Sequence, residues 1–250
     1  MEVHHHPHLP HNAKKFKEYF LEFLMIFLAV SLGFIAENLR EHFSDRSKEK
    51  QYIEAFIRNL QDDTARLKHV IEADSKQVNG IDSFLHLVHL PMNIDSNREQ
   101  FYHLSIQCFY NSATFKSNDA TLQQLKSTGD YRLIEKDHVA DSLSKYDAGN
   151  NDIYDEGDYY EIYFKEILSM LDEMTDLTIY SDTTFIKDNN FTRKPLPAIT
   201  GDSIAMRKLF NKAFSFRGIT GAYVEFNMKP QLENAKRLIA FLKKEYDIND

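Results

Sequence analysis

An apolar stretch from Tyr19 to Ala36, reading YFLEFLMIFLAVSLGFIA, constrains this chain more than any other feature. Glu22 is its one charged residue, and no charge occurs between Phe23 and Ala36. A helix needs roughly 20 mostly apolar residues to cross the ~30 Å hydrocarbon core of a bilayer. Flanking side chains of a slightly shorter stretch can reach the interface. We therefore predict a transmembrane helix over residues 19–36.

Two alternatives give a similar apolar length. A cleaved signal peptide would end in a small-residue cleavage site of the A-x-A type, whereas this stretch continues directly into Glu37-Asn38-Leu39-Arg40. A buried core helix would carry one apolar stripe, whereas here the apolar residues surround the whole helix. Glu22 lies near the end of the stretch, so interfacial contact or pairing with a nearby lysine is favoured over an intramembrane function.

Small residues at positions 29, 33 and 36 lie on one face of the predicted membrane helix. Ala29, Gly33 and Ala36 have the i, i+4, i+7 spacing that lets two membrane helices approach closely. Such residues are common in membrane helices, so the pattern is a weak indication of a dimer face. It makes a homo-oligomer one of the expected partners, beside the lipid bilayer itself.

The charges around the apolar stretch bear on its orientation. Lys14, Lys15 and Lys17 cluster on its N-terminal side, whereas basic residues on the C-terminal side are mixed with acids. Clustered lysines on a short tail favour a cytoplasmic N-terminus. We therefore predict a single-pass protein of the bacterial inner membrane, with a His-rich tail at 1–18, the span at 19–36 and a periplasmic helical domain at 37–250.

The residues after the span predict long helices. No proline or glycine occurs between Ala36 and Val78, so one helix is expected to continue from about residue 14 to residue 79. Its apolar residues recur every seven positions, and another helix must cover such a face. One register is Ile53, Leu60, Leu67, Asp74, Ile81 and Val88, and the other is Ile57, Thr64, Ile71, Val78 and Leu85.

A second and a third long helix are predicted further along the chain. Residues 136–180 repeat every seven positions, with a weak middle at 149–157: Val139, Tyr146, Ile153, Tyr160, Ile167 and Met174 form one register, and Leu143, Asn150, Gly157, Phe164, Leu171 and Thr178 the other. Residues 202–246 begin at the N-cap candidate Asp202, carry the apolar residues Ile204, Leu209, Ala213 and Phe216, and are expected to kink or break around Pro230.

Shorter helices are predicted between the long ones, at 98–110 and at 118–126, the latter ended by Gly129. Gly129 is interpreted as a structural corner between helices, with a partner-binding elbow as the functional alternative. With only 8 glycines and 6 prolines in 250 residues, long helices are favoured over a turn-rich β fold. The predicted fold is all-α: a transmembrane helix that continues into a long helix of an elongated antiparallel bundle.

Charge and motifs exclude several function classes. The first 50 residues carry no net charge, so the net charge of −8 lies in residues 51–250 and argues against nucleic-acid binding. Cys108 is the only cysteine, which excludes an intrachain disulfide and a Cys-based zinc site. The phosphate-binding, dinucleotide-binding, zinc-protease and nucleophile-elbow motifs are absent. We therefore expect neither an enzyme nor a bound cofactor.

Three groups of residues invite a metal-binding interpretation. A mobile tail with Pro7 and Pro10 carries the histidines His4, His5, His6, His8 and His11, which makes them weak candidates for Zn, Ni or Cu. His86 and His89 have helical i, i+3 spacing, with His103 on the next segment, and are interpreted as packed or solvated. The acids between Asp152 and Glu161 fail the EF-hand pattern, because Tyr163 stands where a bidentate Glu is required.

Three segments resemble a family of uncharacterised bacterial single-pass membrane proteins. They are HHHPHLPH at 4–11, FLEFLMIFLAVSLGFIAENLREH at 20–42 and ATLQQLKSTGDYRLIEKDHVADSLSKYD at 120–147. The resemblance covers about the first 60 residues and residues 113–147 well, and the rest loosely. It implies a helical ectodomain on one membrane helix and brings no activity or catalytic residue.

These observations favour a membrane-anchored structural or protein-interaction module, which associates with itself or with an unknown protein partner. A sensory or signalling ectodomain is the first alternative. Residues 1–18 leave no room for a folded effector, so signalling would require a separate partner. A weak metal-binding protein, acting through the His-rich tail, is the second alternative.

Overall fold

The computed structural model describes residues 16–181 and 196–249. The chain divides into two compact units, Met1–Gln51 and Tyr52–Asp250, and each is described by itself. In the first unit, residues 16–51 are helical throughout, and the large apolar side chains between Phe16 and Phe43 are mostly exposed. Among the described residues, one helix near the N-terminus is long and apolar enough to cross a membrane: its most apolar window has a mean hydropathy of 2.2, and none of that window is buried.

Every regular element in the described ranges is a helix, so the predicted all-α class is confirmed. The α-helices are α1 (Phe16–Leu85), α2 (Asp95–Phe109), α3 (Ala120–Thr128), α4 (Asp137–Met174), α6 (Ser203–Ala222) and α7 (Lys229–Glu245). Short 3-10 helices cover His86–His89, Asp130–Leu133 and Leu177–Ser181, and a π-helical segment covers Tyr223–Met228. The prediction that each of these two segments forms one long helix is therefore confirmed for α1 and α4. Helix α4 continues without interruption through residues 149–157, where the sequence repeat is weak.

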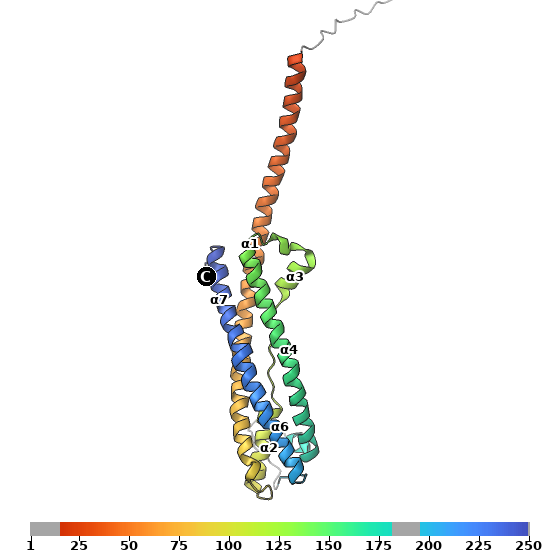
Figure 1. The fold of residues 1–250 in the computed structure, drawn as a ribbon, viewed down its shortest axis with the longest axis vertical. Coiled ribbons are helices and arrows are strands. Elements are labelled where there is room, and N and C mark those ends of the chain that lie inside the picture. Colours follow the sequence, from red (N-terminus) through yellow and green to blue (C-terminus); the bar gives the residue numbers. More distant parts are fainter. Residues whose placement is uncertain (1–15, 182–195, 250) are drawn as a thin grey trace, which may run out of the picture. The chain divides into compact units, whose positions relative to one another are not determined.

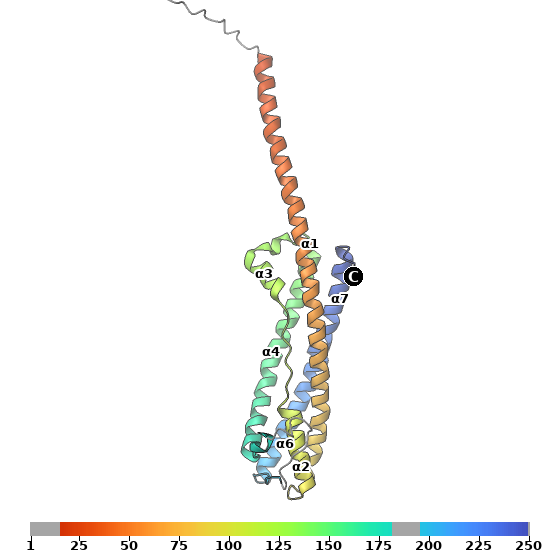
Figure 2. The same ribbon diagram turned by 180° about the vertical axis from the view of Figure 1, so that it is seen from behind.

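Within residues 52–249, three long rods of helix lie side by side: α1 from Tyr52 onward, α4, and the joined α6 and α7 (Figure 1). The rod formed by α6 and α7 runs antiparallel to the other two, whereas α1 and α4 run in the same direction (Figures 1 and 2). Hydrogen bonds confirm that α1 and α4 are parallel: Tyr146 contacts Asp63, and Tyr160, further along α4, contacts Gln77, further along α1. The bundle thus contains one parallel and two antiparallel helix pairs.

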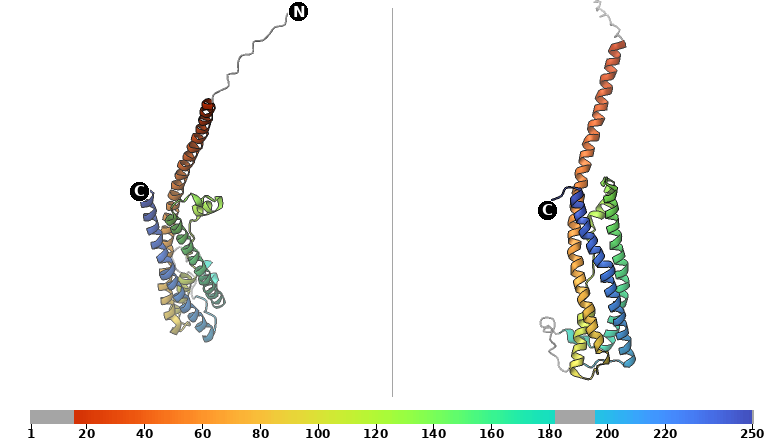
Figure 3. Two further views of the ribbon diagram at one scale, coloured as in Figure 1. Left: turned by 45° about the horizontal axis from the view of Figure 1, so that its top comes forward. Right: turned by 60° about the vertical axis from the view of Figure 1, so that its left-hand side comes forward.

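Two parallel helices cannot be joined by a short turn, because the chain must return along their length. Three segments between α1 and α4 make this return. Helix α2 turns back along the end of α1, the extended segment 111–119 continues in that direction between α1 and α4, and α3 lies where α4 begins (Figures 2 and 3). Gly129 then ends α3 in the left-handed conformation, with φ of 73°. The predicted glycine C-cap is therefore confirmed, because a residue with a side chain would be strained there.

A constant offset of 83 residues relates the facing positions of α1 and α4. Two of the facing pairs are hydrogen-bonded and buried, and three are apolar and share a core cluster. In chain order the pairs are Phe56 with Val139, Asp63 with Tyr146, Val70 with Ile153, Gln77 with Tyr160, and Phe84 with Ile167. Apolar and polar layers therefore alternate along this interface.

The second heptad register predicted for α1 is displaced by one residue. Of Ile57, Thr64, Ile71, Val78 and Leu85, only Ile57 is fully buried. The fully buried set lies one position earlier: Phe56, Asp63, Val70, Gln77 and Phe84. The sequence favoured the more apolar set, whereas Tyr146 and Tyr160 provide hydrogen bonds that make Asp63 and Gln77 acceptable in the core. In the first register, Val88 lies beyond α1 and is exposed.

The third rod begins where the sequence predicts, and a continuous π-helical segment takes the place of the kink or break predicted around Pro230. Asp202 caps α6 by accepting hydrogen bonds from the backbone N–H groups of Ile204 and Ala205 at 2.9 and 2.8 Å. Pro230 lies in the first turn of α7 and cannot donate a backbone hydrogen bond. The π-helical segment Tyr223–Met228 directly precedes α7. Of the apolar residues named in this stretch, Leu209, Ala213 and Phe216 are buried, whereas Ile204 lies in the first turn of α6 and is exposed.

Candidate functional site

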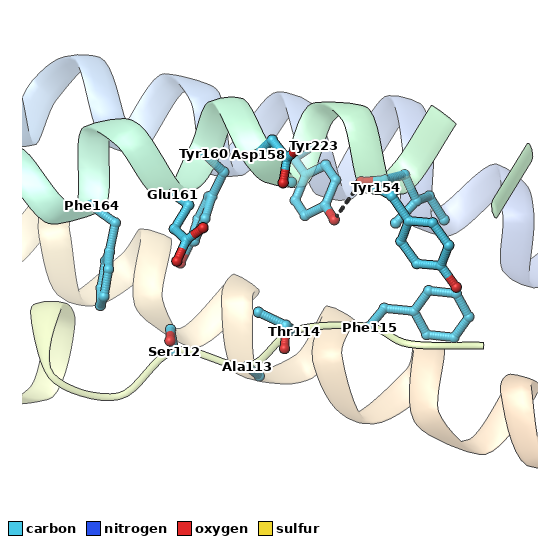
Figure 4. Close-up of a pocket in the computed structure, with 12 residues that line it drawn as sticks. Ser112, Ala113, Thr114, Phe115, Tyr154, Asp158, Tyr160, Glu161, Phe164 and Tyr223 are labelled. Atoms are coloured by element: carbon cyan, nitrogen blue, oxygen red, sulfur yellow. Dashed lines mark hydrogen bonds between the residues drawn. The ribbon is translucent and has the colours of Figure 1, made fainter. Parts of the chain in front are cut away.

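A cavity of about 280 Å³ lies between α4 and the extended segment 111–119 (Figure 4). Five aromatic side chains form most of its wall, together with small side chains from the extended segment and two acids from α4. The aromatic residues are Phe115, Tyr154, Tyr160, Phe164 and Tyr223. A largely apolar, partly enclosed hollow with a few polar groups is the usual form of a small-molecule site.

Gly157 opens this cavity. It lies in the interior of α4, where glycine is less favourable than alanine by roughly 0.5–1 kcal/mol. A Cβ added at this position would lie 3.2 Å from the phenol oxygen of Tyr223. That phenol donates a 3.0 Å hydrogen bond to the carbonyl of Ile153, so it occupies the space beside α4 that a side chain would need. The glycine therefore leaves room for the Tyr223 phenol to lie against α4 at the wall of the cavity.

The hydroxyl groups of the cavity tyrosines are bonded to protein groups. Tyr160 donates to the side-chain oxygen of Gln77 at 3.0 Å. The Tyr154 hydroxyl lies 2.7 Å from the Ser117 hydroxyl and accepts from the Ser117 backbone N–H at 3.0 Å. Because Tyr223 is bonded to Ile153, all three phenols are fixed. What these residues offer to the cavity is chiefly the surface of their rings.

Two acidic side chains lie at the edge of the cavity. Asp158 makes no hydrogen bond or ion pair with any residue that the structure describes, and it is exposed. Glu161 points from α4 toward the extended segment, and its carboxylate pairs with the exposed Lys165 at 3.0 Å (Figure 4). Exposed pairs of this kind contribute roughly 0–1 kcal/mol, so this pair is easily exchanged for another cation. In the described part of the chain, no Lys, Arg or His lines the cavity.

A third carboxylate, Asp74, is buried on α1. It is 2% exposed, and its Oδ2 atom has no hydrogen-bond partner among the described residues. Burial raises the pKa of Asp74 to about 7. Burial also raises the pKa values of Tyr160 and Tyr223, which line the cavity, and the charge of Asp74 raises them further.

The structure describes only some of the metal-binding candidates of the sequence. His4, His5, His6, His8 and His11 lie outside the described residues. His86 and His89 are both exposed on the short helix after α1. In the part of the chain that the structure describes, no three His, Cys, Asp or Glu side chains are grouped to hold a metal ion.

The remaining candidates are placed as follows. Ala29, Gly33 and Ala36 are exposed on α1, and nothing lies within 4 Å of a Cβ added at Gly33. Cys108 is buried, and burial raises its pKa to about 12, so it is a protonated thiol at neutral pH and a poor nucleophile.

Sequence reasoning missed the cavity itself. Its walls come from α4, from the extended segment and from the π-helical segment, which are far apart in the chain. One signal was present: the glycine at 157 interrupts a heptad register, with Tyr154 and Tyr160 three residues away on either side. The sequence showed this as a weak helix, whereas the structure shows an intact helix that lines the cavity.

Comparisons of the chain with protein-family models, with curated proteins and with solved structures each return no match. The resemblance to uncharacterised single-pass membrane proteins therefore stays a prediction.

Proposed function

We propose that this chain is a single-pass membrane protein whose helical domain, residues 52–249, is an interaction module in water. One observation carries the proposal: the apolar window of α1 has a mean hydropathy of 2.2 and none of it is buried. Exposed apolar surface of this extent is unfavourable in water and suits a lipid environment. The family resemblance supports the same proposal. We propose that the protein lies in the inner membrane of a bacterium.

Extraction of membranes with alkaline carbonate tests the anchor. The full chain should stay in the membrane pellet, and a Leu28→Lys/Val30→Lys variant should be released, because two charges near the middle of the span oppose insertion. The matched control is Ile162→Lys/Phe226→Lys, which places the same charges on exposed apolar positions of the helical domain. Release of the unaltered chain by carbonate would refute the membrane anchor.

The proposed orientation puts residues 52–249 in the periplasm. Cys108 is the only cysteine, so a Cys108→Ala background permits a single reporter thiol at the exposed Ser127. In intact Gram-negative cells, a maleimide reagent that passes the outer membrane and not the inner one should label Ser127→Cys. A cysteine placed at Asn12 should be labelled only after lysis. The reverse pattern would place the domain in the cytoplasm.

Self-association is proposed through the small-residue face of the span. The heptad face at 53–85 is covered by helices of the same chain, so it does not require a second copy. The face of Ala29, Gly33 and Ala36 has no such cover. Light scattering in detergent should give a dimer mass for the full chain and a monomer mass for Ala29→Leu/Gly33→Leu. Val30→Leu/Phe34→Leu, on another face, should remain dimeric, and equal masses for all three would exclude this interface.

A sensory domain is the second candidate, and the aromatic cavity favours it. A ligand in the cavity would contact α4 and the π-helical segment together and thereby alter how the bundle packs. Signalling would still require a separate effector. The third candidate, metal binding by the His-rich tail, predicts that deleting residues 4–11 abolishes binding of Zn²⁺ or Ni²⁺ to the full chain. Unchanged affinity after the deletion would exclude it.

A further inference from the structure

We infer that the cavity between α4 and the segment 111–119 binds a small organic cation, with a quaternary ammonium as the best-fitting head group. The inference goes beyond membrane anchoring and self-association. It depends on the cavity in residues 52–249 and on neither the membrane span nor its orientation.

The aromatic walls are the first argument. The rings of Tyr160 and Phe164 are stacked, with centroids 6.1 Å apart and an interplanar angle of 13°, and the Tyr223 ring lies 6.0 Å from that of Tyr160. The negative faces of aromatic rings attract cations, and grouped rings of this kind bind quaternary ammonium ions. Because the phenols of Tyr154, Tyr160 and Tyr223 are already hydrogen-bonded, a ligand meets their rings more than their hydroxyls.

Charge is the second argument. Asp158 and Glu161 lie at the edge of the cavity, and no basic side chain among the described residues lines it. A hollow with two carboxylates at its edge, in a protein of net charge −8, attracts cations and repels anions. Asp158 has no ionic partner among the described residues, so a bound cation would supply one.

The same walls discriminate among cations. A primary ammonium has three N–H donors that need acceptors, whereas a quaternary ammonium donates no hydrogen bond and loses nothing among aromatic rings. Calcium requires six to eight oxygen ligands. The cavity has only two lining carboxylates, and aromatic rings form most of the rest of its wall, so it does not suit calcium. The volume of about 280 Å³ is at the lower end for ligand sites, so the ligand is small.

Calorimetric titration of the full chain with choline tests this inference. The protein should be held in a maltoside detergent, because phosphatidylcholine would present the same head group. Choline should bind with saturation. Its uncharged isostere 3,3-dimethyl-1-butanol should have an affinity at least about tenfold lower. Equal binding of the two would show an apolar site and overturn the inference, as would absence of choline binding at millimolar concentration by protein with an unaltered thermal unfolding transition.

Paired variants with equal charge changes locate the site. Asp158→Asn/Glu161→Gln should weaken choline binding by about tenfold, because both carboxylates at the cavity edge are neutralised. Asp152→Asn/Asp155→Asn removes the same charge from exposed positions of α4 outside the cavity and should leave the affinity unchanged. Equal losses in both variants would assign the effect to net charge and refute the site. Displacement of choline by equimolar Ca²⁺ would identify a metal site instead and would also refute it.

Discussion

The phenol of Tyr146 on α4 donates a 2.8 Å hydrogen bond to the carboxylate of Asp63 on α1, and both side chains are buried. The same offset of 83 residues joins Tyr160 to Gln77 two heptads further along each helix, beyond an apolar layer. A slip of one heptad between these helices would place Asp63 opposite Val139 or Ile153 and remove the phenol donor from a buried carboxylate. The polar layers thus define one register for the parallel helices.

Tyr146→Phe should lower the free energy of unfolding by about 1–3 kcal/mol, because the buried Asp63 carboxylate loses a donor. The Asn118 backbone N–H, at 2.6 Å, would remain as its partner. Urea unfolding followed by circular dichroism measures this loss. Tyr159→Phe is the matched control, since its hydroxyl contacts only that of Tyr163 on the surface, at 3.2 Å, and should change stability by less than about 0.5 kcal/mol. Equal effects would remove the special role of the buried pair.

Asp74 should make the fold less stable as pH rises. Its pKa is about 7 in the folded protein and 3.8 as a free side chain, so between these values the folded state holds a proton that the unfolded state has lost. Stability from this group is therefore complete below about pH 3.8 and is lost as pH rises through about 7. Asp74→Asn should remove this dependence and raise stability at neutral pH by a few kcal/mol.

The measurement for Asp74 is urea unfolding across that pH range for both proteins. Tyr160 from α4 and Tyr223 from the π-helical segment are the ionisable groups that feel its charge, and their raised pKa values keep them neutral throughout. The slope of stability against pH should therefore differ between the two proteins by about the one proton that Asp74 binds. Parallel curves would show that the pKa of Asp74 is the same in the folded and unfolded states.

Gly80→Ala should destabilise the bundle by about 1–3 kcal/mol, because the added methyl group would lie 2.8 Å from the sulfur of the buried Cys108. Gly218→Ala is the matched control: no atom lies within 4 Å of its added Cβ, so better helix propensity should stabilise the protein by up to about 1 kcal/mol. Combining Gly80→Ala with Cys108→Ala should recover part of the loss. Strictly additive effects in this double-mutant cycle would contradict the contact.

Leu171→Asp should destabilise the fold by several kcal/mol, since it buries an unpaired charge in the cluster that contains Ile167 and Leu209. Ile162→Asp makes a similar change on the same helix at a position that is 55% exposed. Thermal unfolding should therefore separate the two variants clearly, with Ile162→Asp close to the unaltered protein. A near-normal transition for Leu171→Asp would contradict the burial of this face.

The sequence predicted those features that depend on neighbouring residues. The absence of proline and glycine gave the length of α1, and the periodicity of Val139 to Met174 gave the buried face of α4. Asp202 and Gly129 were identified as caps because each acts through its own backbone neighbourhood. The helical class and most of the core therefore followed from local pattern alone.

Features that depend on distant contacts did not follow from the sequence. Thr64 and Val78 are more apolar than Asp63 and Gln77, so apolar periodicity predicted the wrong buried residues on α1. Asp63 and Gln77 are buried because Tyr146 and Tyr160 donate hydrogen bonds to them. The parallel course of α1 and α4 depends on the extended segment 111–119, which has no helical or strand periodicity of its own. The cavity lies on that segment and was missed for the same reason.

The parallel course of α1 and α4 has a consequence for the order of folding. Helix α1 adjoins α2 through the short connection 86–94, from which their contacts can close progressively. Residues 83 apart on α1 and α4 have no such starting point, and contacts so distant in sequence slow folding. We expect these layers to form last, so that Tyr146→Phe accelerates unfolding in stopped-flow measurements and leaves the refolding rate nearly unchanged. The lifetime of the folded bundle is then set by how often α1 and α4 separate.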